Sequence, residues 1–159
     1  MKIVDLQEAR KKGKTHLLEL IQKLAFEDAK QLVHQIHKAA ENLHPHNIII
    51  LMHVPPFKEN ARHQGKLCEP THLPLFLSKV TGDMIRRCAS KYPHIDFQVL
   101  CGHTHSLSFY KPLSNMTVKA GSSVLGKHPI QDIMFIDSST ARQTLTSEHS
   151  NHRETQKGR

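Results

Sequence analysis

The feature that most constrains the fold is a long apolar stripe near the start of the chain. Its members recur at spacings of three and four residues, which places them on one face of a helix. They are Leu18, Ile21, Ala25, Ala29, Leu32, Ile36, Ala40 and Leu43. Thr15 is a candidate N-cap, Pro45 cannot continue a helix, and the length of the pattern allows a break near residues 26–28. The sequence therefore predicts one long amphipathic helix before Pro45.

Two later apolar runs have the length of strands, and each is followed by histidine. Residues 48–52 form an unbroken run that is typical of a buried central strand, covered on both faces, and His53 follows it. Residues 97–101 form the second run, which leads into Gly102-His103-Thr104-His105. The sequence therefore predicts that two strands each end at a histidine.

The segments around these strands carry weaker signals. Residues 57–75 have no clear period and are expected to form a long loop with little structure of its own. A second helix is expected over about residues 78–91, with Ser78 or Thr81 as its cap. Short strands, expected to be antiparallel, are predicted near 108–111, 116–120 and 132–137.

Composition divides the chain into three parts. Residues 1–16 form a basic N-terminal segment, residues 17–137 form the folded domain, and residues 138–159 have almost no large apolar residue. Such a composition cannot offset the entropy of ordering, so a disordered tail is predicted there.

The charge balance indicates the kind of ligand that the surface attracts. Lys and Arg number 22 against 14 Asp and Glu, a net charge of +8, which favours phosphate-bearing ligands at long range. No aromatic stacking platform accompanies the basic clusters, so a nucleic-acid partner is not expected.

Cysteine spacing and hydropathy bear on the location of the protein. Cys68, Cys88 and Cys101 are widely spaced and form no CxxC pair, which favours a reduced, cytoplasmic setting. No apolar run reaches the roughly 18 residues of a membrane span, and no signal peptide is recognisable. Neither membrane insertion nor export is expected.

Histidine is over-represented, at 14 residues in 159, so short histidine pairs arise by chance and each histidine is judged by its setting. His34 and His37 lie on the predicted long helix among Lys and Gln and are expected to face solvent. Others are expected in surface loops, where His63 or His72 could touch a substrate: His44, His46, His63, His72, His94 and His128.

The order of these elements resembles the calcineurin-like metallophosphoesterases over about residues 20–137. The motifs that carry the resemblance are Met-His-Val-Pro-Pro at 52–56 and Cys-Gly-His-Thr-His at 101–105, followed by Gly-Ser-Ser at 121–123. The resemblance covers the C-terminal half of that family's domain. It implies an α/β (α+β) fold, here a partial β-sandwich flanked by helices.

The resemblance also implies a metal-dependent phosphoric ester hydrolase. His53 and His103 would ligate one metal and His105 the other, with Mn, Fe or Zn as the expected ions. In the family two such metals bind the phosphate oxygens and lower the pKa of a shared water. Gly102 is expected to supply the backbone freedom for the turn between the histidines.

The first half of the family pattern has no counterpart in the sequence. D-x-H, G-D-x-x-D and G-N-H motifs do not occur, and Gly82-Asp83 fails as part of the second because Arg86 occupies the place of its last Asp. The catalytic set is therefore incomplete, and we expect little or no activity from the chain alone. A missing N-terminal half is the implied partner, and the strands at Ile48 and Phe97 are expected to lose a neighbouring strand or a packed face.

A second interpretation stays open beside the phosphoesterase. The chain could be a non-catalytic α/β domain that binds a single metal or an acidic partner through its basic surface. The sequence identifies neither the phosphate ester nor the metal, because one metal core serves many substrates.

Overall fold

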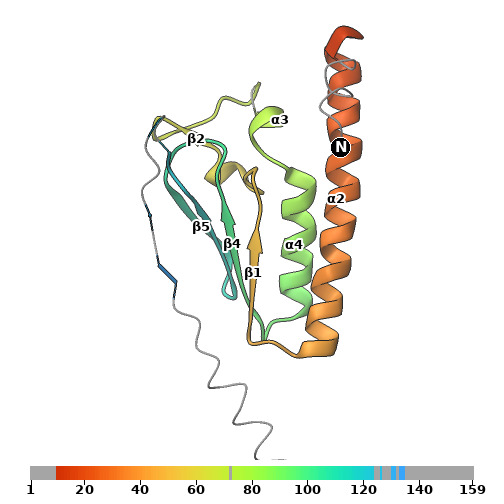
Figure 1. The fold of residues 1–159 in the computed structure, drawn as a ribbon, viewed down its shortest axis with the longest axis vertical. Helices are drawn as coiled ribbons and strands as arrows, with labels where there is room; N and C mark the ends of the chain where they lie inside the picture. Colours follow the sequence, from red (N-terminus) through yellow and green to blue (C-terminus); the bar gives the residue numbers. More distant parts are fainter. Residues whose placement is uncertain (1–9, 72, 124–125, 127–129, 132, 135–159) are drawn as a thin grey trace, which may run out of the picture. The chain divides into compact units, whose positions relative to one another are not determined.

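A computed structural model describes residues 10–71, 73–123, 126, 130–131 and 133–134 (Figure 1). The chain divides into two units, 1–128 and 129–159, and every helix and strand below belongs to the first. In chain order they are α2 (Lys14–Leu43), β1 (Asn47–Leu51), the 3-10 helix η1 (Lys58–Asn60), β2 (Arg62–His63), β3 (Lys66–Leu67), α3 (Leu73–Phe76), α4 (Lys79–Lys91), β4 (Asp96–Cys101), β5 (Ser108–Leu113) and β6 (Met116–Ala120). The fold is mixed α and β, as predicted.

The main sheet has four strands in the order β1-β4-β6-β5. β1, β4 and β6 run parallel, and β5 is antiparallel to β6. The antiparallel expectation is therefore right for the β5–β6 pair and wrong for β6 against β4. The strand predicted at 132–137 and the tail at 138–159 fall almost wholly outside the described residues.

α2 is one continuous helix of 30 residues, so the break allowed near residues 26–28 is absent. That stretch is Phe-Glu-Asp, with no Pro or Gly to interrupt the helix. Gly13 rather than Thr15 is the N-cap, and the helix ends at His44 in the left-handed conformation, just before Pro45. In the part of the chain that the structure describes, no helix has both the length and the apolar character needed to cross a membrane.

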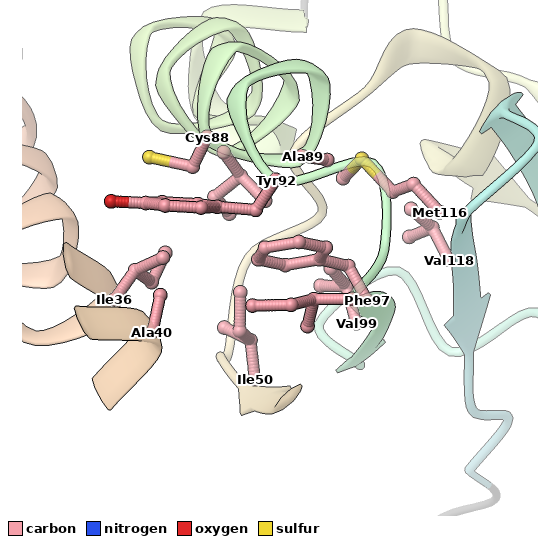
Figure 2. Close-up of a cluster of buried hydrophobic side chains, with 12 residues drawn as sticks. Ile36, Ala40, Ile50, Cys88, Ala89, Tyr92, Phe97, Val99, Met116 and Val118 are labelled. Atoms are coloured by element: carbon pink, nitrogen blue, oxygen red, sulfur yellow. The ribbon is translucent and has the colours of Figure 1, made fainter. Parts of the chain in front are cut away.

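Helices α2 and α4 cover the same face of the sheet, and the core lies between these helices and the strands (Figures 1 and 2). Strand residues alternate in burial: Phe97 is 1% exposed and Val99 0%, whereas Gln98 between them is only partly covered. The helices contribute small and aliphatic side chains together with Tyr92. The buried cluster comprises Ile36, Ala40, Ile50, Ile85, Cys88, Ala89, Tyr92, Ile95, Phe97, Val99, Met116 and Val118.

The predicted burial of β1 on both faces is wrong. β1 lies at an edge of the sheet, and although Ile50 is 5% exposed, Leu51 is 77% exposed. An all-apolar run does not show whether one face or both faces of the strand are buried. Among the described residues, the helices lie on one face alone. The expectation that this strand has lost a neighbouring strand or a packed face stays a prediction.

The region 57–75 has more structure than predicted. It contains η1, the antiparallel β2–β3 hairpin and α3. Gln64 and Gly65 take positive φ values of 50° and 78° at the turn, and the Arg62 side chain donates hydrogen bonds to the Glu59 and Gly65 carbonyls. Such short, turn-based elements leave no period in the sequence, so the sequence predicts a loop in their place.

Candidate metal centre

The parallel pairing of β1 and β4 brings the two histidine motifs together. Leu51 lies beside Leu100 in the register, the Met52 N–H donates to the Leu100 carbonyl (3.0 Å), and the Gly102 N–H donates to the His53 carbonyl (3.0 Å). The carboxyl end of β6 lies beside that of β4, where the Gly121 N–H donates to the Cys101 carbonyl (2.9 Å). The carboxyl ends of parallel strands are the usual place for ligand sites in open α/β sheets.

Just beyond the carboxyl ends of β1 and β4, the imidazoles of His53 and His103 are in contact. His103 Nδ1 lies 3.0 Å from His53 Nε2, and the ring centroids are 4.9 Å apart at an interplanar angle of 69°. The two nitrogens form a hydrogen bond, in which one ring donates its N–H to the other and the tautomer decides which. A metal held by both nitrogens, at the usual zinc–imidazole length of about 2.0–2.1 Å, would replace this hydrogen bond and require the two lone pairs to turn toward the ion. His53 is exposed and His103 half-buried, so solvent reaches the pair.

Two features hold the His103 ring in place. Phe76 of α3 packs against it, with centroids 5.5 Å apart. The next residue, Thr104, is 1% exposed, and its N–H donates to the Gly102 carbonyl (2.8 Å), which fixes the turn. No sequence signal pointed to Phe76, because α3 is a single short turn within the aperiodic region.

The backbone strain of this turn lies in the histidines rather than in Gly102. His103 and His105 have φ values of 68° and 58°, whereas Gly102 is not among the residues with positive φ. The expectation that Gly102 supplies the unusual backbone conformation is therefore wrong. Left-handed non-glycine residues cost free energy and occur preferentially at functional sites.

His105 does not join the pair. Its side chain is exposed, and the residue before it, Thr104, is buried. Among the described residues, no three His, Cys, Asp or Glu side chains gather closely enough to hold a metal ion. The structure thus brings together two of the three predicted ligands, and they are the two expected to share one metal.

Cys101 precedes the Gly102 turn and is engaged elsewhere. Burial raises the pKa of its thiol to about 12, and the thiol donates a hydrogen bond to the Lys119 carbonyl (3.5 Å). Among the described residues, Cys101 does not form a metal-holding group with the histidine pair.

The β2–β3 hairpin is fixed against the segment after His105. The Gly65 N–H donates to Ser106 Oγ (3.3 Å), and Asn60 Nδ2 donates to Ser108 Oγ (3.0 Å). His63 is exposed on this hairpin, so a contact between His63 and a substrate stays a prediction. His72 lies outside the described residues.

The prediction that His37 faces solvent is wrong. Its Nδ1 lies 2.7 Å from the Tyr92 hydroxyl, and that hydroxyl donates to Glu41 Oε1 (2.8 Å). Because the hydroxyl has a single proton, His37 Nδ1 must be the donor in the first contact. The signal that could have found this network is the four-residue spacing of His37 and Glu41, which places them on one helix face.

Comparison of the chain with protein-family models, with curated proteins and with solved structures finds no match. Support for a metal centre therefore comes from the two histidine motifs and from the contact between their rings. The sandwich fold and the two-metal chemistry implied by the resemblance stay hypotheses.

Proposed function

We propose that this chain is part of a metal-dependent phosphoesterase, in which His53 and His103 would ligate one metal ion and His105 would ligate the other once the remaining ligands are supplied. The observation that carries the proposal is the 3.0 Å contact between His103 Nδ1 and His53 Nε2, residues 50 positions apart in sequence. This pairing is the one that the metallophosphoesterase motifs assign to a single metal. A divalent ion bound there, with Mn, Fe or Zn expected, would polarise a phosphate ester and activate a water.

The described residues fit one weak site better than a complete dinuclear centre. The two imidazoles would supply two ligands to a metal, and no anionic side chain among the described residues joins them. A pair of dications needs carboxylate ligands to offset its charge. We therefore propose that the missing ligands come from another polypeptide segment, and that the substrate is a phosphate ester of a class still to be identified.

Metal titration tests the site directly. Zn²⁺ binding measured by calorimetry should weaken at least about tenfold in both His53→Ala and His103→Ala, because each change removes one of two ligands. His34→Ala, which removes an exposed histidine from α2, should leave this binding unchanged. Equal Zn²⁺ affinity in all four proteins would refute the assignment.

A non-catalytic binding domain is the second candidate. The observation that favours it is the face of the sheet away from the helices, which no described helix covers and where Leu51 is 77% and Phe109 62% exposed. This second function would be favoured if the histidine variants lose Zn²⁺ binding while the affinity of the chain for a partner is the same with and without Zn²⁺.

A further inference from the structure

The tip of the β2–β3 hairpin, residues 63–66, is fixed beside the turn that carries the histidine motif. Gln64 and Gly65 both have positive φ, as the type I′ turn of a two-residue hairpin requires. The Gly65 N–H donates to Ser106 Oγ (3.3 Å), and Ser106 directly follows His105 in the chain. Figure 1 shows β2 at the end of the sheet where β1 and β4 terminate. The hairpin tip therefore adjoins the candidate metal centre.

The hairpin tip presents two exposed side chains that carry nitrogen donors. His63 and Lys66 are opposite each other in the strand register, so both project from one face of the hairpin. Both residues are exposed, and among the described residues neither forms an ion pair with Asp or Glu. Arg62, by contrast, is occupied by the Glu59 and Gly65 carbonyls. His63 and Lys66 are thus open to a ligand.

The charges around the hairpin tip are of one sign. Residues 42–58 and 97–131, which carry the two histidine motifs, contain no Asp or Glu. The acidic residues nearest to the tip in sequence are Glu59 and Glu69, which precede and follow the hairpin rather than lie on it. The local distribution of charge therefore favours an anion at the hairpin tip.

We propose that the hairpin tip binds a phosphate group of the substrate, so that the substrate carries two phosphate groups. This inference rests on the proposed function, because the phosphate ester that is hydrolysed is assigned to the metal centre. An ammonium and an imidazole N–H on one face are suitable donors to phosphate oxygens, and the bond from Lys66 is charge-assisted. The Gly65–Ser106 bond keeps the Cα atoms of Lys66 and His105 within about 15 Å of each other. The two side chains and a ligand with two phosphate groups can span that distance.

Binding of inorganic phosphate without metal tests the hairpin by itself. In amide NMR of the labelled chain at constant ionic strength, phosphate should shift Gln64, Gly65 and Lys66. Lys66→Met removes the charge and should weaken phosphate binding at least about tenfold, whereas Lys66→Arg should retain it. Lys38→Met, which removes an exposed lysine from α2, is the matched control. Equal phosphate affinity of Lys66→Met and the natural chain, or shifts confined to the basic residues 10–14, would overturn the proposal.

A ligand with two phosphonate groups tests the substrate class. With Zn²⁺ bound, propylene bisphosphonate should bind at least about tenfold more tightly than propylphosphonate, and Lys66→Met should abolish this preference. Titration of each compound into Zn²⁺ without protein corrects for chelation by the compound itself. If the Zn²⁺-loaded chain binds both compounds equally, the hairpin does not contribute to substrate binding and the proposal is wrong.

The hairpin proposal and the metal site fail in different ways. A chain that does not bind Zn²⁺ would refute the metal site, while the metal-free phosphate titration still tests the hairpin. A chain that binds Zn²⁺ through His53 and His103, but binds phosphate no better than Lys66→Met does, would keep the metal site and refute the hairpin proposal. Circular dichroism checks that each variant folds.

Discussion

Tyr92 connects the two helices through its hydroxyl. The residue is 8% exposed in the core, and its hydroxyl points toward α2 (Figure 2). There the hydroxyl bonds to His37 and Glu41. Lys91 lies over the ring, with Nζ 5.0 Å from its centroid, and 3.6 Å from Glu41 Oε1. One residue therefore contributes both apolar packing and a polar contact between α2 and the end of α4.

Removing that hydroxyl should destabilise the fold without emptying the core. Tyr92→Phe keeps the ring but loses two hydrogen bonds, so the free energy of unfolding should fall by about 1 kcal/mol, measured by urea denaturation. Tyr110→Phe is the control, since the Tyr110 ring contacts Phe57 while its hydroxyl makes no hydrogen bond to a described residue. Equal losses in the two variants would show that the Tyr92 network contributes nothing.

The same network makes stability depend on acid. The hydrogen bond from Tyr92, and then the charge of Lys91, hold the pKa of Glu41 below its ordinary value of 4.5. A lowered folded-state pKa means that Glu41 stabilises the fold above the unfolded pKa, and that this stabilisation is lost as pH falls through the folded value. The difference in unfolding free energy between the natural chain and Glu41→Gln should therefore shrink below about pH 4.5. A constant difference from neutral to acidic pH would contradict this.

At the scale of single residues, the sequence predicted that two of the candidate histidines lie together. His53 and His103 could be identified because each directly follows a strand-length apolar run, and the structure places them in contact. The left-handed backbone of His103 and His105 and the burial of Thr104 between them follow from no residue pattern. His37 was misjudged because its partner, Tyr92, is 55 positions away in sequence.

The segment after β1 is packed tightly against α4. A Cβ placed on Gly82 of α4 would lie 2.2 Å from the Pro56 carbonyl oxygen, a backbone atom that cannot rotate away. Pro55 and Pro56 are both buried, and the Ser78 N–H donates to the Pro55 carbonyl (2.9 Å). This contact fixes the chain just beyond His53.

The two glycines beside the candidate site should respond differently to alanine. Gly82→Ala forces Pro56 and α4 apart and should lower the free energy of unfolding by about 1–3 kcal/mol in thermal or urea denaturation. Gly102→Ala should be nearly neutral, because the nearest atom to its added Cβ is the His53 oxygen at 4.0 Å and its φ is not positive. A larger loss for Gly102→Ala than for Gly82→Ala would contradict this account.

Elements with a strong period could be predicted, and elements set by contacts could not. α2, α4, β1 and β4 follow from helical spacing or from apolar runs, and the structure confirms them within a few residues. The hairpin and α3 depend on turn geometry and on bonds to distant residues such as Ser106. The sequence does not predict that β6 runs parallel to β4. The two strands are separated in the sequence by β5, which is the antiparallel neighbour of β6.

For the whole molecule, the balance of ligands predicts the outcome of an activity assay. With Zn²⁺ or Mn²⁺ present, the chain should hydrolyse neither p-nitrophenyl phosphate nor its diester above the rate in metal-containing buffer, because the described residues lack the anionic ligands of a two-metal centre. His103→Ala is the control. Hydrolysis by the natural chain that this variant abolishes would show that the chain forms a complete site.

The parallel register of β1 and β4 has a consequence for folding. Side chains on a strand alternate between faces, so a slip by one residue would turn Ile50 out of the core and carry His53 away from Gly102. Correct strand alignment and assembly of the imidazole pair are therefore the same event. Metal binding would therefore measure the fraction of molecules with the correct register, because conformers with a shifted register would not bind the ion.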